Sequence, residues 1–241
     1  MKRTERRHLK QNEFEVVTLQ ALELLGERRR ELSMVGLVVG VIALVGGVYW
    51  VWHQHVLNSS HALLADAMIV QESRVGPPSA ATGQPGLTFP TERERAQAAI
   101  VKFKAAADAY PTTDAGLFAR YQEAALQLSI GSTADAIKTY QEVIDRAGDG
   151  LYGQMARLGM AEAYARGGQY EQAITAYKEL AQRKDTQLPV DGILIQLGRT
   201  YRDAGKIADA QQTFNRIVEE FPESQFNADA KRELEALKKP A

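Results

Sequence analysis

The sequence has no cysteine, and this absence removes several classes of function at once. A chain without thiols forms no disulfide, has no cysteine nucleophile, builds no cysteine-type zinc site and carries no lipid on a cysteine anchor. An excess of positive charge is missing as well, because 29 Lys and Arg residues stand against 30 Asp and Glu residues, for a net charge of −1. Without such an excess, and without a basic stripe interleaved with aromatic residues, we expect no nucleic-acid partner.

The known signatures of catalysis are also missing. The sequence has no phosphate-binding glycine loop, no HExxH zinc motif and no GxSxG nucleophile elbow. His53 and His55 form a His-x-His pair with His61 nearby, and such a pattern is compatible with a metal site. Because the three histidines follow an apolar segment, we favour the interpretation that they lie in the hydrated interface of a membrane. We therefore predict no enzyme, no metal site, no cofactor and no small-molecule substrate.

One long apolar run stands out against this background. Residues 34–52 (MVGLVVGVIALVGGVYWVW) are 19 positions without a charged side chain. As a helix they cover about 28 Å of the roughly 30 Å hydrocarbon layer of a bilayer. A buried core helix or a cleaved signal sequence is the alternative, but no clean Ala-x-Ala cleavage signal follows the run. We predict a single, retained transmembrane helix over 34–52.

Charges that flank the run predict its orientation. Arg28, Arg29 and Arg30 precede it, whereas Arg74 is the only Lys or Arg between the run and residue 92. Basic residues resist translocation, so the preceding segment is expected to stay in the cytoplasm. In a bacterium the chain would then be a single-pass inner-membrane protein whose C-terminal domain lies in the periplasm.

Small residues share one face of this predicted span. Gly36, Gly40, Ala43 and Gly47 are spaced by 4, 3 and 4 residues, which leaves a shallow groove where another helix can approach closely. Glycine is common in membrane helices in any case. These four residues, which we call the seam, therefore predict a helix-packing surface. The partner helix is either a second copy of this span or a helix of another subunit.

The other segments complete the predicted domain plan. Residues 1–33 are expected to form a cytoplasmic amphipathic helix that lies on the membrane, against a partner or in solvent. Residues 53–91 are expected to hold a first helix over 57–73 and a Pro- and Gly-rich loop over 75–91. Residues 92–241, which are rich in straight-chain helix formers, are predicted to be a helical array that ends in a capping helix over 224–239.

The array shows an internal period of 37 residues. A small residue recurs at this step, an aromatic residue follows it by four, and a small or aliphatic residue follows that by three. A fourth register holds a glycine, which is expected in a left-handed turn between two helices. The four registers are Ala99, Ala136, Ala173, Ala210; Phe103, Tyr140, Tyr177, Phe214; Ala106, Val143, Leu180, Ile217; and Gly131, Gly168, Gly205.

This pattern resembles the tetratricopeptide repeat (TPR) family. The best match, LGRTYRDAGKIADAQQTFNRIVEEFPES, carries Leu197, Gly198, Tyr201, Gly205, Ala210, Phe214 and Pro222 at the consensus spacing. Earlier units depart from it: Ala161 replaces the usual glycine, Gln127 replaces the usual tyrosine, and the first unit needs residues 57–73 as its first helix. The resemblance implies an all-α solenoid of about four helical hairpins with a capping helix.

The resemblance also implies where partners bind. The Lys and Asn of the family's two-carboxylate clamp are replaced by Leu158 with Glu162 and by Ile195 with Arg199, so we do not expect chaperone C-termini as ligands. Charged residues on a helix are also ordinary solvated surface, and that alternative stays open. In the family's register, five residues lie on the inner face formed by the first helix of each hairpin: Tyr121, Glu162, Arg166, Arg199 and Arg202.

The whole layout is similar to the YfgM-like family, the ancillary subunit of the bacterial SecYEG translocon. The similarity lies in FEVVTLQALELLGERRRELS ahead of the span, SSHALLADAM after it, and the repeats. It implies association with the translocon and with periplasmic chaperones or client proteins. The tail FPESQFNADAKRELEAL is also similar to envelope scaffold proteins of outer-membrane assembly, cell-wall or division machinery, which is the alternative function.

Overall fold

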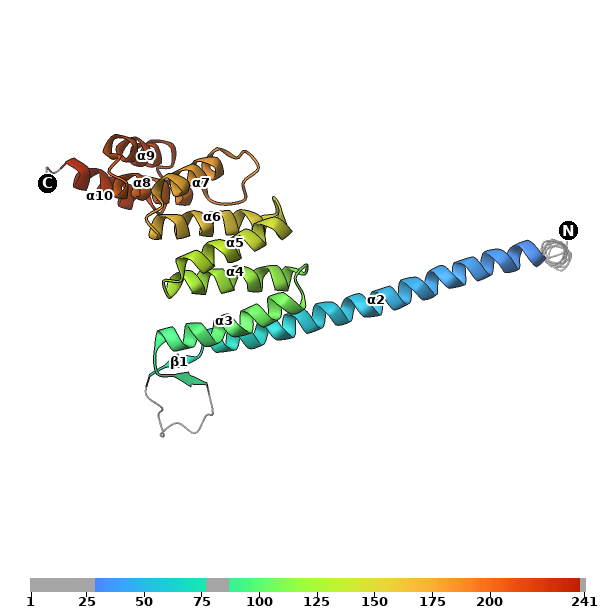
Figure 1. Ribbon diagram of the computed structural model, residues 1–241. Coiled ribbons are helices and arrows are strands. Elements are labelled where there is room, and N and C mark those ends of the chain that lie inside the picture. The colour runs from blue at the N-terminus through green and yellow to red at the C-terminus, as the bar shows by residue number, and fades with distance from the viewer. Residues whose placement is uncertain (1–28, 77–86, 239–241) are drawn as a thin grey trace, which may run out of the picture. The chain divides into compact units, whose positions relative to one another are not determined.

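The computed structural model describes residues 29–76 and 87–238, whose regular elements are helices and two very short strands (Figure 1). The expected all-α class, with TPR-like hairpins and one long apolar helix that fits a single span, is confirmed. The chain divides into two units, Met1–Val56 and Leu57–Ala241. The elements are α2 (Arg29–Gln71), β1 (Arg74–Val75), β2 (Thr88–Phe89), α3 (Glu92–Ala109), α4 (Asp114–Ser129), α5 (Thr133–Ala147), α6 (Leu151–Arg166), α7 (Tyr170–Gln182), α8 (Val190–Asp203), α9 (Ile207–Glu220) and α10 (Asn227–Lys238).

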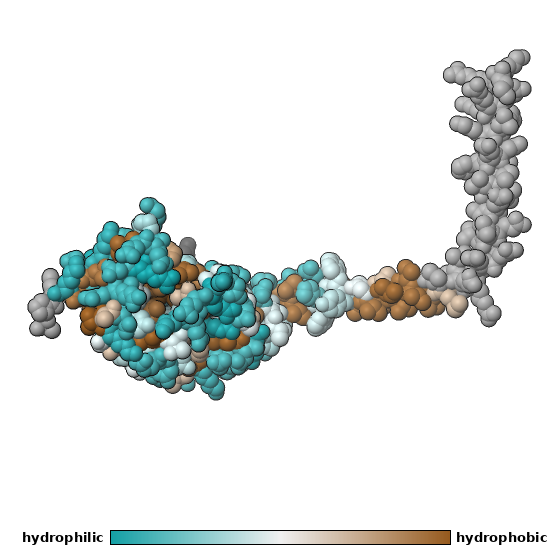
Figure 2. Space-filling view, turned by 90° about the horizontal axis from the view of Figure 1, so that it is seen from above, coloured by the Kyte–Doolittle hydropathy of each residue, from teal (hydrophilic) through white to brown (hydrophobic). Residues whose placement is uncertain are grey.

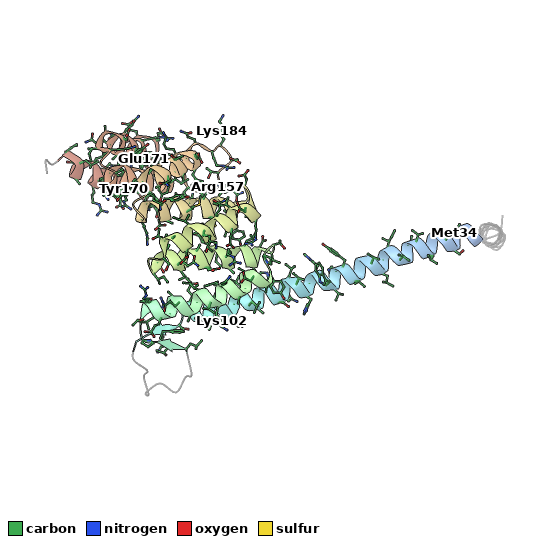
Figure 3. The ribbon with its side chains drawn as sticks, in the orientation of Figure 1. Met34, Lys102, Arg157, Tyr170, Glu171 and Lys184 are labelled. Atoms are coloured by element: carbon green, nitrogen blue, oxygen red, sulfur yellow. The ribbon has the colours of Figure 1, made fainter. Side chains whose placement is uncertain are left out.

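The first unit contains the apolar part of α2. Its large side chains are exposed, from Met34 (labelled in Figure 3) at 62% to Trp52 at 59%, and Figure 2 shows them as a hydrophobic surface. Among the described helices, α2 alone is long and apolar enough to cross a membrane. The amphipathic helix expected within residues 1–33 falls mostly on residues 1–28, which lie outside the described ranges.

The predicted span over 34–52 and the predicted helix over 57–73 belong to one element. α2 is one uninterrupted helix of 43 residues, because the connecting residues His53 to Val56 contain neither proline nor glycine and nothing there ends a helix. The helix ends at Gln71, two residues before the expected end. At that end the Ser73 hydroxyl donates to the Ile69 carbonyl at 2.7 Å.

The predicted loop over 75–91 is not entirely irregular. β1 and β2 pair in parallel, with Arg74 opposite Thr88 and Val75 opposite Phe89, and they bring the two ends of the segment together. Arg95 of α3 donates from Nη1 to the Ser73 carbonyl at 3.2 Å. This hydrogen bond joins the start of the segment to α3. Residues 77–86 lie outside the described ranges.

The second unit is a stack of hairpins. The end of α2 pairs with α3, and α4 with α5, α6 with α7 and α8 with α9 follow, after which α10 covers the last hairpin (Figure 1). We call the end of α2, α4, α6 and α8 the first helices, and α3, α5, α7 and α9 the second helices. Thr91 starts α3 by accepting from the Glu94 backbone N–H at 3.2 Å, and Thr113 caps α4 in the same way.

The periodic residues form the core of this stack. Ala99, Ala136, Ala173 and Ala210 are fully buried, and so are the aromatic side chains that follow each of them by four positions. Small residues let the helices approach closely, and the rings fill the space toward the neighbouring helices. The 37-residue pattern is therefore a packing pattern.

The glycine register forms the turns between first and second helices. Gly131, Gly168 and Gly205 have φ values of 85°, 72° and 75°, in the left-handed region that glycine adopts cheaply. The N–H of the next residue returns to the preceding helix, as Gln169 does to the Tyr164 carbonyl at 2.8 Å. The expected left-handed glycine turns are confirmed.

Candidate protein-binding surface

The first helices form the narrower side of the stack. α4 contacts α6 and α6 contacts α8, whereas the described second helices have no contacts of similar extent among themselves. Stacked hairpins that are closer on one side curve toward that side. We call the exposed side of α4, α6 and α8 the inner face.

Three of the sequence-predicted residues lie together on this face. Tyr121 of α4 is half-buried, and burial raises its pKa, with the charge of Glu162 on α6 adding to the rise. Glu162 in turn accepts from Arg166 Nη2 at 2.5 Å, one helical turn along α6. Tyr121, Glu162 and Arg166, which we call the central patch, thus combine a ring, an acceptor and a donor.

Two buried tyrosines support the central patch. The ring centroids of Tyr140 and Tyr121 lie 5.7 Å apart, and the two rings are tilted at an interplanar angle of 55°. Burial raises the pKa of Tyr140 and of Tyr177; the charge of Glu162 adds to both rises, while Arg166 opposes them. Periodicity assigned these two rings to packing alone, and no sequence signal marked them as neighbours of the patch.

The other two predicted residues lie at a different place, on α8. Arg199 donates from Nη2 to Asp229 at 3.2 Å and from Nε to Glu233 at 3.1 Å. Arg202 donates to Glu233 at 2.5 Å and to Asp203 at 2.8 Å. Both arginines are thus held by carboxylates of the capping helix α10, so the structure separates the five predicted residues into two groups.

A buried charge cluster, which the sequence did not reveal, joins α3, α4 and α5. Arg120 is 5% exposed and donates to Glu123, which is 3% exposed, at 2.8 Å. The same guanidinium pairs with Asp108 of α3 and lies 3.5 Å from Glu142 of α5. Burial raises the pKa of Glu123 against the opposing charge of Arg120. This cluster connects three helices and offers no open site.

A hollow of about 490 Å³ lies between the first two hairpins. Its lining includes Gln71, Arg93, Arg95, Leu126 and Ile130. The arginines already donate to backbone carbonyls, Arg93 to Ile130 at 3.3 Å and Arg95 to Ser73. Within residues 29–76 and 87–238, no three His, Asp or Glu side chains gather in a way that would hold a metal ion.

The predicted seam in α2 has open surroundings. A Cβ added to Gly36, Gly40 or Gly47 would meet nothing within 4 Å. An apolar groove on a different face of the same helix is lined by Leu44, Val45, Val48, Tyr49 and Trp52. Its use as a packing surface stays a prediction.

Comparison with known proteins places the fold. The model of a family described as tetratricopeptide repeat-like domain matches residues 28–239. Among solved structures, the chain is similar to the nearly identical TPR-like repeats of a Podosopora anserina protein described as a kinesin light chain, with 13% identity, a TM-score of 0.53, and 61% of this chain and 79% of that chain covered. A single-substitution variant of the same protein gives 13% identity, a TM-score of 0.51, and coverage of 61% and 78%. No curated protein matches the chain.

Proposed function

Because the chain belongs to the tetratricopeptide repeat-like domain family, we propose that it works by binding other proteins on the inner face of its hairpins and not by catalysis. The observation that carries this proposal is the central patch. Tyr121, Glu162 and Arg166 put an aromatic ring and both signs of charge within reach of one ligand. Tyrosine and arginine are the residue types that most often dominate protein interfaces.

The second part of the proposal is that the array is held at a membrane by α2. Residues 34–52 cross the bilayer, the basic residues before them stay in the cytoplasm, and residues 53–241 lie in the periplasm of a bacterium. Enzymatic reporters fused after Ala241 test the topology. A reporter that is active only outside the cytoplasm should be active, and activity of a cytosolic reporter would contradict this part.

The third part names the partner class. We propose an ancillary role at the Sec translocon and in the periplasmic chaperone network, supported by the order of amphipathic segment, span and repeat array in the sequence. Such a role places the inner face near emerging, incompletely folded chains. An exposed face built from several helices is suited to extended or helical segments of such chains.

Chemical crosslinking of the full chain in native membranes, followed by mass spectrometry, tests the partner class. Translocon subunits and newly translocated envelope proteins are the expected partners. Recovery of outer-membrane assembly, cell-wall or division proteins in their place would favour the alternative, an envelope scaffold.

The last part concerns the span itself. We propose that Gly36, Gly40, Ala43 and Gly47 form the surface on which another membrane helix packs. Gly40→Ile together with Gly47→Ile should reduce either self-association or the recovery of membrane partners. If both stay unchanged while Val41→Leu, a control within the span, also has no effect, the seam has no packing role.

A further inference from the structure

The capping helix α10 is joined to α8 by ion pairs. Its carboxylates Asp229 and Glu233, four residues apart and therefore on one face, receive three donations from Arg199 and Arg202 of α8 at 3.2, 3.1 and 2.5 Å. The charged side chains remain between 16% and 36% exposed. Pairs at this exposure are screened by salt and contribute little to stability.

The apolar contacts of α10 are few. Ala230 alone among its residues is fully buried, and Leu234 and Leu237 are partly buried against the core of the last hairpin. With 12 residues, α10 is at the length below which an isolated helix is marginal in water. A short helix held by screened ion pairs, one buried methyl group and two partly buried leucines can leave its groove at a small free-energy cost.

This charge recognition is specific to the last groove. One repeat earlier, 37 residues before Asp229 and Glu233, stand Gly192 and Gln196, and Ala165 stands in the place of Arg202. The junction between α6 and α8 therefore lacks the ion pairs that join α8 to α10. The two arginines are a feature of the groove that receives the terminal helix.

We propose that the groove formed by α8 and α9 is an exchangeable docking site for an acidic amphipathic helix of another protein, with α10 as its resident occupant. The resident helix defines the ligand chemistry: two carboxylates at positions i and i+4 for Arg199 and Arg202, and small or aliphatic residues at i+1, i+5 and i+8 for the apolar floor. A partner helix with these features gains the same contacts as α10. This inference rests on the proposed protein-binding function and names a second surface, separate from the central patch.

The test uses the full chain and a fluorescent peptide with the sequence of residues 224–239. In the unaltered chain α10 occupies the groove, so the peptide should bind weakly. Glu233→Gln with Leu234→Ala loosens α10 in place, and the peptide should bind at least about tenfold more tightly, since apparent affinity follows the open fraction of the site. Added salt should weaken this binding.

Variants of the groove separate docking from general destabilisation. In the loosened background, Arg199→Gln should reduce peptide affinity about tenfold, while Arg216→Gln, which removes an exposed pair with Glu220 on α9, should not. If the double variant loses helical content, Glu233→Gln alone is used, because it weakens the attachment of α10 less. Two results would overturn the proposal. In the first, the peptide binds to no loosened chain that keeps its helical circular dichroism; in the second, Arg199→Gln leaves the peptide affinity unchanged. Partner capture at the central patch would be unaffected by that result, so failure here is distinguishable from failure of the proposed function.

Discussion

The ring of Tyr140 on α5 lies directly on the backbone of Gly159 on α6, so closely that a Cβ added to Gly159 would stand 2.4 Å from the ring carbon Cζ. The last hairpin contains a similar contact, in which a Cβ on Gly198 would stand 2.4 Å from Cε1 of Phe214. The rings of Tyr140 and Phe214 thus depend on the missing side chains of these two glycines. Because Tyr140 also touches Tyr121, the first contact links the core to the central patch.

This contact predicts that Gly159→Ala destabilises the array. Alanine favours a helix over glycine by about 1 kcal/mol, but overpacking against the ring should cost about 1–3 kcal/mol and reverse that gain. Urea unfolding followed by circular dichroism measures the difference. Gly192→Ala is the matched control, because its Cβ would meet Phe226 at an ordinary 3.4 Å; equal stability of the two variants would contradict the packing.

Tyr177 gives the second prediction. The side chain is 1% exposed and lies in the largest core cluster, so Tyr177→Ala should cost about 3–5 kcal/mol through the cavity it leaves. A lowered thermal midpoint and earlier proteolysis of the last two hairpins are expected. An unchanged melt would mean that the aromatic register is wrong.

The glycine turns give the third prediction. Gly168 has φ 72° and open space where a Cβ would stand, so strain and not a clash decides the effect of a substitution. Gly168→Ala should cost about 1–2 kcal/mol. Gly168→Asn should cost less, since asparagine tolerates the left-handed region better. The comparison of the two denaturation midpoints tests this order, and a larger loss for Asn would refute it.

The buried cluster gives the fourth prediction. Arg120→Met leaves Glu123 buried without its partner and should cost about 3–5 kcal/mol at pH 7. Burial already raises the pKa of Glu123, and loss of Arg120 raises it further. When the pKa of a carboxyl group is higher in the folded state than in the unfolded state, the protein loses stability as pH rises from the unfolded pKa to the folded pKa. The variant should therefore recover stability as pH falls.

A second carboxyl group acts in the same direction. Lys104 and then Arg120 lower the pKa of Asp108, so its contribution to the unaltered chain is present above the unfolded pKa and is lost in acid. The stability gap between the unaltered chain and Arg120→Met should therefore narrow from pH 7 to pH 4 in urea titrations, as Glu123 takes up its proton in the variant, and should narrow further below pH 4, where Asp108 takes up its own. Arg120→Met with Glu123→Leu should recover most of the loss at pH 7. A gap that does not change with pH would contradict this account.

The sequence predicted the repeat because its signal is local and periodic. Hairpin packing repeats every 37 residues, so Ala136 and Tyr140 can be recognised from Ala173 and Tyr177 without knowledge of the fold. The contact of Tyr140 with Gly159 was not predictable in this way, since Gly159 lies 19 residues further on and belongs to none of the four registers. The same is true of the contacts that Arg120 makes with Asp108 and Glu142, which lie on the helices before and after its own.

The candidate site was predicted in part. Family register put Tyr121, Glu162 and Arg166 on one face, and the structure brings them together. Register could not reveal that Arg199 and Arg202 pair with α10, because the position of a terminal helix depends on its own contacts and not on the repeat. The continuity of α2 was missed because the apolar run and the later helix differ in composition, although nothing between them breaks a helix.

Photocrosslinking tests the protein-binding claim most directly. A photoreactive amino acid is placed at the position of Glu162 in the central patch or, as a control, at the exposed position of Lys178 on α7, in the full chain in native membranes. Light-dependent adducts with other proteins are expected at position 162 and not at position 178. Adducts that are absent at 162, or equally abundant at 178, would contradict the claim that the inner face of the repeats binds partners.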